Sequence, residues 1–245
     1  SGHLGLAGFF LGLPYQGLTF YLALHLGTLL ALIAYFWKDL WHLARAVLAI
    51  RSLRELDTMQ RMGLGIALST IPAAIVGASM PDAFTESLRT PVLIAINLIV
   101  FGVLLGLADR YGGGHRGEGA ISYRDALLIG AAQALALIPG TSRSGITMTA
   151  GLALGLDRAT RYSFLMAVPI TVLAVGHGGL QLAQGSEQLD LSVLALGITV
   201  SALAGIVVIH VFLRILRQVG TLPFVAYRIG LGLLVLVPSD RVPAP

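Results

Sequence analysis

A short segment around one arginine carries the strongest chemical signal in the chain. Residues 139–147 read PGTSRSGIT. The Pro-Gly pair turns the chain, and Ser142 or Ser144 can cap the helix that follows. The free N–H groups and dipole of a helix N-terminus attract an anion, and the guanidinium of Arg143 presents a rigid fork of donors to phosphate oxygens. With the hydroxyl of Thr147 added, the segment predicts a phosphate or diphosphate site.

Two residues outside this segment are further candidates for the same site. His3 can act as a general base or as a nucleophile in phosphoryl transfer, although a lone histidine more often has a structural role. Arg228, beside Tyr227 in an apolar stretch, is a second phosphate-binding candidate, with an interfacial anchor as the alternative. Hydrogen bonds between helices explain the other polar groups in apolar stretches. These groups are His25, Asn97, Gln133, His177 and His210.

Composition places these residues in a membrane protein. The chain of 245 residues is 56% hydrophobic and 11% charged, with a mean hydropathy of +0.84, whereas a soluble domain carries about 25% charged residues. An arginine at the bilayer centre costs about 2.5–3.5 kcal/mol even on the lenient insertion scale, and a bound anion would offset that cost for Arg143. The alternative is an arginine that snorkels to the interface or pairs with a loop carbonyl. Because cysteine is absent, disulfides and thiolate metal sites are excluded.

The apolar stretches predict the fold class. Six of them approach the roughly 20 residues that a spanning helix needs: Phe20–Trp37, Met62–Met80, Pro91–Ala108, Tyr162–Leu180, Leu191–Leu213 and Leu222–Pro238. Three others are too short to span: Leu4–Leu13, Ala126–Ile138 and Gly145–Leu156. The last two flank Pro139-Gly140 and predict a re-entrant hairpin, which is tolerated where protein or a water-filled cavity covers it. The expected fold is an all-α integral membrane protein with about six transmembrane helices plus re-entrant helical hairpins.

The basic residues predict the topology. The net charge of +4 could point to nucleic acid, but twelve of the 16 Lys and Arg residues fall in four predicted loops. The loops are Lys38–Arg61, Asp109–Arg124, Asp157–Arg161 and Arg214–Thr221. Six spans and one hairpin place all four loops on the same side, and the positive-inside rule makes that side cytoplasmic.

An internal repeat relates the two halves of the chain. Ser1–Leu13 and Ser144–Leu156 match at seven of thirteen positions, with an offset of 143 residues. In each half, a short segment is followed by three spans. Since three is odd, the second copy is inverted in the membrane, and a site is expected where the two copies meet.

The repeat also predicts the domain organisation. Residues 1–245 are expected to form a single membrane domain, with repeats of about 1–110 and 121–240. The second copy has an arm before the match, Ile121–Arg143, that the first copy lacks. Roughly 20 further residues are therefore expected before Ser1.

These motifs resemble the bacterial undecaprenyl-diphosphate phosphatases, the BacA/UppP family. The PGxSRSGxT motif of that family is similar to Pro139–Thr147 without a mismatch, and its SSxGH motif is similar to the start Ser1-Gly2-His3. The likeness continues through short segments along the whole chain, among them residues 25–31, 71–73, 133–140, 167–169 and 223–228.

The resemblance implies hydrolysis of the terminal phosphate of undecaprenyl diphosphate, which recycles the lipid carrier of peptidoglycan synthesis and is associated with bacitracin resistance. It also implies a divalent cation, Mg²⁺ or Ca²⁺, and an active site toward the outer face of the bacterial cytoplasmic membrane. By this likeness His3 and Arg143 are the catalytic residues. The residues expected around the diphosphate are Ser1, Ser142, Arg143, Ser144, Thr147 and Arg228. The expected partners are the lipid substrate and membrane lipids without nucleic acid, and a homodimer stays an open alternative.

One departure from the family concerns the metal. The family carries an ExxxE motif and a further serine just before the SGH, and neither is present in this sequence. The glutamates of the chain all fall in predicted loops: Glu55, Glu86, Glu118 and Glu187. They form no carboxylate pair for an oxygen-seeking cation. The metal ligands are therefore expected before Ser1, and these 245 residues alone are expected to be inactive or nearly so.

Two other classes of membrane protein stay as alternatives. A lipid-diphosphate transporter or flippase would also use inverted repeats and broken helices, and phosphate release separates the two because flipping breaks no bond. A second lipid phosphatase class combines separate PSGH and SRx5HxxxD motifs. Its histidine should follow Arg143 by six positions, where this chain has Thr149.

Overall fold

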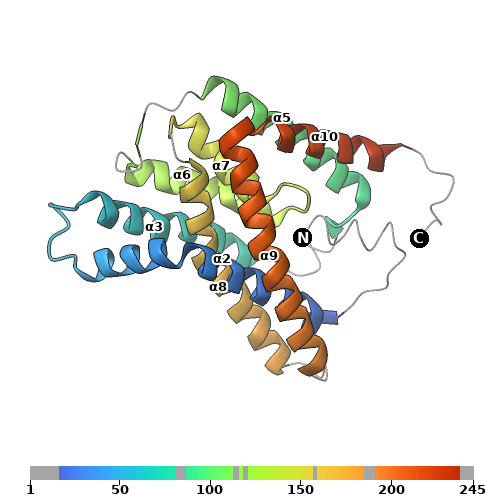
Figure 1. Cartoon of the computed structure of the whole chain (residues 1–245), viewed down its shortest axis with the longest axis horizontal. Coiled ribbons are helices and arrows are strands. Elements are labelled where there is room, and N and C mark those ends of the chain that lie inside the picture. The colour runs from blue at the N-terminus through green and yellow to red at the C-terminus, as the bar shows by residue number, and fades with distance from the viewer. Residues whose placement is uncertain are drawn as a thin grey trace.

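The computed structural model describes residues 17–80, 87–112, 116–117, 121–156, 159–184 and 191–237. Within these ranges the regular structure is helical, apart from one isolated bridge between Arg116 and Leu156. With the labels of Figure 1, the elements in chain order are α2 (Gly17–Leu48), α3 (Thr58–Ser79), α5 (Pro91–Tyr111), α6 (Tyr123–Ala134), the 3-10 turn η2 (Leu135–Leu137), α7 (Arg143–Ala153), α8 (Ala159–Gln184), α9 (Leu191–Val219) and α10 (Leu222–Leu236). The predicted all-α membrane fold is confirmed.

Among the described residues, five helices are long and apolar enough to cross a bilayer: α2, α3, α5, α8 and α9. Lipid must cover most of α9, because only Ile209 and Leu213 of its side chains are buried. The sixth predicted span, Leu222–Pro238, corresponds to α10, which has 15 residues. At 1.5 Å per residue α10 is roughly 22 Å long, which is less than the hydrocarbon core of about 30 Å. It lies beside α5 (Figure 1) as a shorter helix.

The helix α2 is longer than the first predicted span, Phe20–Trp37. It continues to Leu48 with a bend at Phe36, where φ is −104° and ψ is 20°. Part of the predicted loop Lys38–Arg61 is therefore helical, which corrects that prediction. The physical reason is packing, since the added turns bury Leu43 in the main core cluster.

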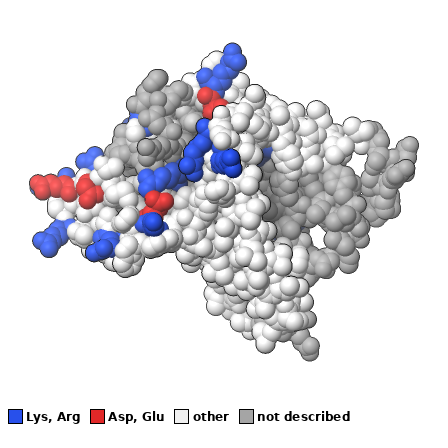
Figure 2. All heavy atoms as spheres, viewed as in Figure 1, with Lys and Arg blue, Asp and Glu red and all other residues white. Residues whose placement is uncertain are grey.

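The predicted basic loops meet at one end of the helices, which we call the basic end. Two polar interactions join different loops there, Arg161 with Asp39 and Thr221 with Asp109, and Arg116 pairs with Asp125 at the start of α6. Figure 2 shows the charged side chains gathered over this part of the surface, while the other described atoms of this face are mostly uncharged. The structure thus confirms that the four loops share one end of the molecule, and the cytoplasmic assignment of that end stays a prediction.

The elements α6, η2 and α7 form the predicted re-entrant hairpin. Helix α6 begins at the basic end with a capping box made by Ser122 and Asp125. Helix α7 returns to the same end, where Arg116 donates to the carbonyl oxygen of Leu154. Because α6 has 12 residues and α7 has 11, each is only about 16–18 Å long. The turn between them, residues 138–142, therefore lies near the middle of a hydrocarbon core of about 30 Å.

Small residues bring α2 and α9 into close contact, as expected for helices packed in a membrane. A Cβ atom at Gly27 would lie 2.5 Å from the carbonyl oxygen of Ile198. Beside this contact, the Ser201 hydroxyl donates to the carbonyl oxygen of Leu24 at 2.8 Å. These contacts hold the part of α2 that carries His25.

The first copy of the predicted repeat, Ser1–Leu13, lies outside the described residues. Its counterpart, Ser144–Leu156, forms most of α7 and the turn after it. The internal repeat and the single-domain organisation built on it stay predictions.

Candidate active site

The turn at the tip of the hairpin is pressed against α5. Gly140 has φ of +91°, and a Cβ atom there would lie 2.5 Å from the carbonyl oxygen of Ile94. The position therefore excludes other residues on both conformational and steric grounds. Asn97 of α5 donates from Nδ2 to the carbonyl oxygen of Pro139 at 2.9 Å. This bond bears out the structural role predicted for Asn97.

Ser142 starts α7 from a strained backbone conformation. Its φ is +68°, and it is the one described residue other than glycine with a positive φ. Strain of this kind costs of order 1–3 kcal/mol and clusters at functional sites. The Ser142 Oγ accepts a hydrogen bond from the backbone N–H of Gly145 at 3.3 Å, so its own proton stays available for a ligand.

Arg143 extends from the first turn of α7 toward α8. Its Nη1 donates to Thr171 Oγ1 at 2.5 Å and to the carbonyl oxygen of Ala167 at 3.2 Å. Both bonds use one nitrogen, so Nη2 and Nε keep no bond to the described part of the chain. The described residues also place no carboxylate within ion-pair distance of Arg143. The bond to Ala167 agrees with the alternative of an arginine paired with a backbone carbonyl, but it leaves the charge of Arg143 open to an anionic ligand.

Arg228 lies beneath the same turn and is 6% exposed. Its Nη2 donates to the carbonyl oxygens of Gly140 and Thr141 at 3.0 and 2.9 Å, and its Nε donates to that of Leu98 at 3.4 Å. The guanidinium therefore holds together backbone acceptors that the turn leaves unpaired. The alternative of an interfacial anchor does not agree with this burial.

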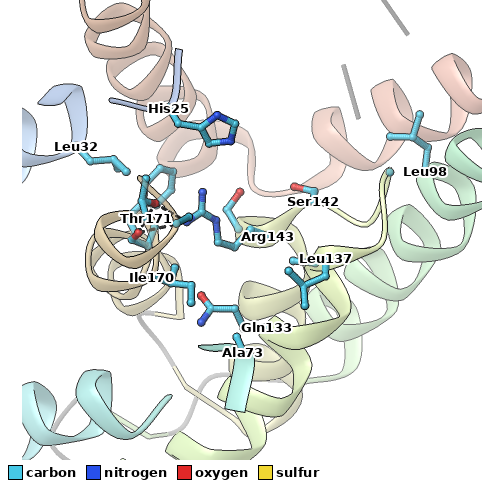
Figure 3. Close-up of a pocket in the computed structure, with 16 residues that line it drawn as sticks. His25, Leu32, Ala73, Leu98, Gln133, Leu137, Ser142, Arg143, Ile170 and Thr171 are labelled. Atoms are coloured by element: carbon cyan, nitrogen blue, oxygen red, sulfur yellow. Dashed lines mark hydrogen bonds between the residues drawn. The ribbon is translucent and has the colours of Figure 1, made fainter. Parts of the chain in front are cut away.

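A cavity of about 450 Å³ opens beside the tip of the hairpin. Figure 3 shows the side chains that line it, with Arg143 between His25 of α2 and Gln133 of α6. The lining includes Ser142 and Ser144, and its other members are mostly apolar side chains from α2, α5, η2 and α8. One cation, two hydroxyls and apolar walls suit a ligand with an anionic head and a hydrocarbon tail.

Comparison with known proteins now adds to this geometry. The model of the family described as "Bacitracin resistance protein BacA" matches residues 1–234. The chain belongs to the BacA family. Among its relatives, the "Undecaprenyl-diphosphatase" of Nitrosococcus oceani is 45% identical over 96% of this chain and 89% of the relative. The "Undecaprenyl-diphosphatase 2" of Stutzerimonas stutzeri is 46% identical over 97% of this chain and 90% of the relative.

The structure brings only some of the expected site residues of this BacA-family chain together. Ser142, Arg143 and Ser144 line the cavity, whereas Thr147 and Arg228 are not among its lining residues. Thr147 is 2% exposed and faces α8, where its hydroxyl lies 2.6 Å from that of Ser163. Thr147 lies on the same face of α7 as Arg143, which also bonds to α8, but one helical turn farther from the tip of the hairpin.

The other expected residues concern the N-terminus and the metal. Ser1 and His3 lie outside the described residues, so their roles stay predictions. Within the described ranges, no group of three or more His, Asp or Glu side chains is close enough to hold a metal ion. These residues alone do not fit a divalent cation, and we derive no step through one.

Two polar residues of the cavity had only a structural role in the sequence prediction. His25 donates from Nδ1 to the carbonyl oxygen of Tyr21 at 2.8 Å, and this bond does not involve Nε2. Gln133 is 2% exposed, and its Oε1 is buried without a partner among the described residues. Their position as polar residues in apolar stretches was the sequence signal that could have indicated a site. Only the packing of α2 and α6 around Arg143 shows that His25 and Gln133 line the same cavity.

Proposed function

We propose that this BacA-family chain hydrolyses undecaprenyl diphosphate to undecaprenyl phosphate and inorganic phosphate. The relatives named undecaprenyl-diphosphatase align with nearly the whole chain. The observation that carries the proposal is Arg143, a cation at membrane depth that faces a cavity and lacks a carboxylate partner among the described residues. A lipid diphosphate brings both the negative charge that this guanidinium needs and a tail that stays in the bilayer.

The nitrogens of the Arg143 guanidinium have two different roles in this proposal, anchoring and phosphate binding. Nη1 is anchored to α8 by Thr171 and Ala167, which fixes the orientation of the plane. Nη2 and Nε then form a fork for two phosphate oxygens. Charge that develops on the phosphoryl group in the transition state is stabilised by donors that are already in place.

The serines on either side of Arg143 complete the anion site. The Ser142 Oγ accepts from Gly145, so its own proton is available to a ligand in the cavity. Ser144 also lines the cavity. The strained turn at Ser142 positions its hydroxyl before substrate arrives, so less ordering is needed in the transition state.

The remaining parts of the proposed machinery follow the family resemblance. His3 acts as the catalytic histidine, as base or nucleophile, and Ser1 contributes to substrate binding. The same resemblance implies a divalent cation, Mg²⁺ or Ca²⁺, whose charge would offset that of the diphosphate; the described residues hold no group of ligands for it. Thr147 and Arg228 support the site from behind, Thr147 through its bond to Ser163 and Arg228 through the turn carbonyls.

We place the enzyme in the bacterial cytoplasmic membrane with the site toward the outer face. Support comes from the depth of the cavity relative to the basic end. His25 precedes Asp39, which pairs at the basic end, by 14 positions in α2, or roughly 21 Å. The cavity thus extends from the hairpin tip near mid-core to His25, which is nearer to the face opposite the basic loops, and the positive-inside rule makes that face the outer one.

Phosphate release in detergent tests the proposal against lipid transport. The purified full-length protein is given undecaprenyl diphosphate with Mg²⁺, with Ca²⁺ and with a chelator, and inorganic phosphate is measured. We expect metal-dependent release that Arg143→Ala abolishes. Arg124→Ala removes an exposed arginine from the same hairpin and serves as the matched control. A well-folded wild type that releases no phosphate would favour a transporter.

A further inference from the structure

Gln133 of α6 has a buried acceptor that the proposed function does not use. The side chain is 2% exposed, and its Oε1 has no hydrogen-bond partner among the described residues. A buried polar atom without a partner is costly, so each one calls for an explanation. Because Gln133 also lines the cavity of Arg143, a ligand in that cavity can supply the missing donor.

The orientation of the Gln133 amide follows from its neighbour on α3. Its Nε2 donates to the carbonyl oxygen of Ser69 at 3.5 Å. A carbonyl oxygen only accepts, so the nitrogen of the amide, and not its oxygen, belongs on that side. Figure 3 shows the amide oxygen turned toward the side of the cavity where the Arg143 guanidinium lies. Because the bond to Ser69 is long, the amide can adjust toward a ligand.

The neighbouring polar groups show what kind of donor is missing. Arg143 and Ser142 offer donors, which suit ionised phosphate oxygens. Gln133 Oε1 offers an acceptor, and two acceptors repel each other unless a proton lies between them. The other titratable group among the described lining residues is His25 of α2, since α3, α5, η2 and α8 contribute apolar side chains and one threonine. An anion beside Gln133 must therefore carry a proton of its own.

We propose that Oε1 of Gln133 accepts a hydrogen bond from a P–OH group of the terminal phosphate and so selects the singly protonated form of the lipid diphosphate. The inference rests on the proposed phosphatase function and makes Gln133 a specificity-determining residue. Organic phosphate groups lose their last proton at about pH 6, so both forms of the substrate are present near neutral pH. Inorganic phosphate keeps at least one proton there, and the same bond can form to the product.

Two small anions of the same shape and charge isolate this hydrogen bond. At about pH 6 methylphosphonate and methanesulfonate each carry one negative charge, but only methylphosphonate has an O–H group. Both are tested as inhibitors of phosphate release from undecaprenyl diphosphate. We expect wild type to prefer methylphosphonate by about 10-fold or more, and Gln133→Met, which keeps the side-chain length without the amide, to lose about 10-fold of that preference.

The ratio of the two inhibition constants also removes other contributions. A bound metal ion acts on both anions in wild type and variant alike, so its effect cancels when their preferences are compared. Gln218→Met changes an exposed glutamine of α9 and should keep the wild-type preference. An unchanged preference in folded Gln133→Met would overturn the inference, because Oε1 then takes its proton from Arg143 or from water.

The pH dependence gives a second measurement that a structural role would not affect. The kcat/KM of Gln133→Met should lie below wild type at about pH 6 and approach it at about pH 8, where the terminal phosphate has lost its last proton. His25 and Arg143 are the same in both proteins, so their titration does not alter the ratio. A deficit of equal size at both pH values would make Gln133 a structural residue and remove the proposal.

A binding measurement separates this inference from the phosphatase function. The shift of the thermal midpoint of wild type with each anion, in the presence of a chelator, requires neither turnover nor a variant that folds. A larger shift with methylphosphonate supports the inference, and equal shifts contradict it. An active wild type with equal shifts keeps the phosphatase function, whereas an inactive wild type with unequal shifts loses that function but keeps a site for a protonated anion.

Discussion

The two arginines beside the hairpin turn occupy environments that differ in one decisive way. Arg228 is 6% exposed and directs Nη2 to the carbonyl oxygens of Gly140 and Thr141. Arg143 is half-buried and faces a cavity of about 450 Å³. Both of its hydrogen bonds to the described residues start from Nη1. Backbone carbonyls pair with Nε and Nη2 of Arg228, whereas Nη2 and Nε of Arg143 have no partner among the described residues and are available to a ligand in the cavity.

The comparison teaches how a membrane protein can hold cations near the middle of the bilayer for different purposes. Backbone carbonyls left unpaired by the broken helix offset the burial of Arg228, and Arg228 in turn stabilises the turn. Arg143 depends on that turn for its position. Removing Arg143 should therefore affect chemistry, and removing Arg228 should affect structure first.

The largest expected effect comes from Arg143. Arg143→Ala should lower kcat/KM by about 10³-fold or more, because the phosphoryl oxygens lose their charged fork. Arg143→Lys restores the charge without the fork and should recover only a small part of that loss. Steady-state phosphate release by both variants measures this, and a fully active lysine variant would show that charge alone suffices.

The second effect is on stability at Arg228. Arg228→Ala leaves two buried carbonyl oxygens unpaired and should lower the free energy of unfolding by about 2–4 kcal/mol. Thermal unfolding in detergent should show a clearly lower midpoint, while Arg143→Ala keeps or raises its midpoint. Equal midpoints for the two variants would remove the distinction drawn between the arginines.

A smaller effect, on stability, distinguishes the backbone strain at Ser142 from the role of its hydroxyl in catalysis. Both Ser142→Gly and Ser142→Ala remove the hydroxyl and should lower kcat to a similar extent. Glycine tolerates φ of +68° and alanine does not, so the glycine variant should be the more stable by about 1 kcal/mol. Thermal midpoints compare the two, and a more stable alanine variant would argue against strain at this position.

The smallest effect lies at the base of the hairpin, at Asp125. Burial raises the pKa of this carboxyl, but hydrogen bonds from Arg116 and Ser122 and the charge of Arg116 outweigh burial, so the net pKa is lowered. A lowered pKa in the folded state contributes stability above the unfolded value of about 3.9, which is lost as pH falls through the folded pKa. The thermal midpoint of Asp125→Asn should therefore lie below wild type at pH 7 and approach it near pH 3. A pH-independent difference would show that the carboxylate charge does not contribute.

Sequence reasoning predicted the hairpin well and the neighbourhood of the site less well. Pro139-Gly140 between two short apolar segments was sufficient to predict a broken, re-entrant element, and Arg143 followed as its anion-binding group. The same reasoning placed Thr147 and Arg228 with the substrate, which stays a prediction; the structure shows in addition that Thr147 bonds to Ser163 and Arg228 to the turn. It gave His25 and Gln133 only a structural role, although both line the cavity.

The sequence by itself determined that this is a membrane protein, that it is helical, that it contains the hairpin, and that its basic loops share one end. These depend on composition, on apolar length and on residues close together in the chain. Only the tertiary structure decided which of two buried arginines faces a cavity and which polar side chains join it there. That decision requires the register in which α2, α6 and α8 pack around α7, and a rotation of any helix by one residue would present different side chains to Arg143.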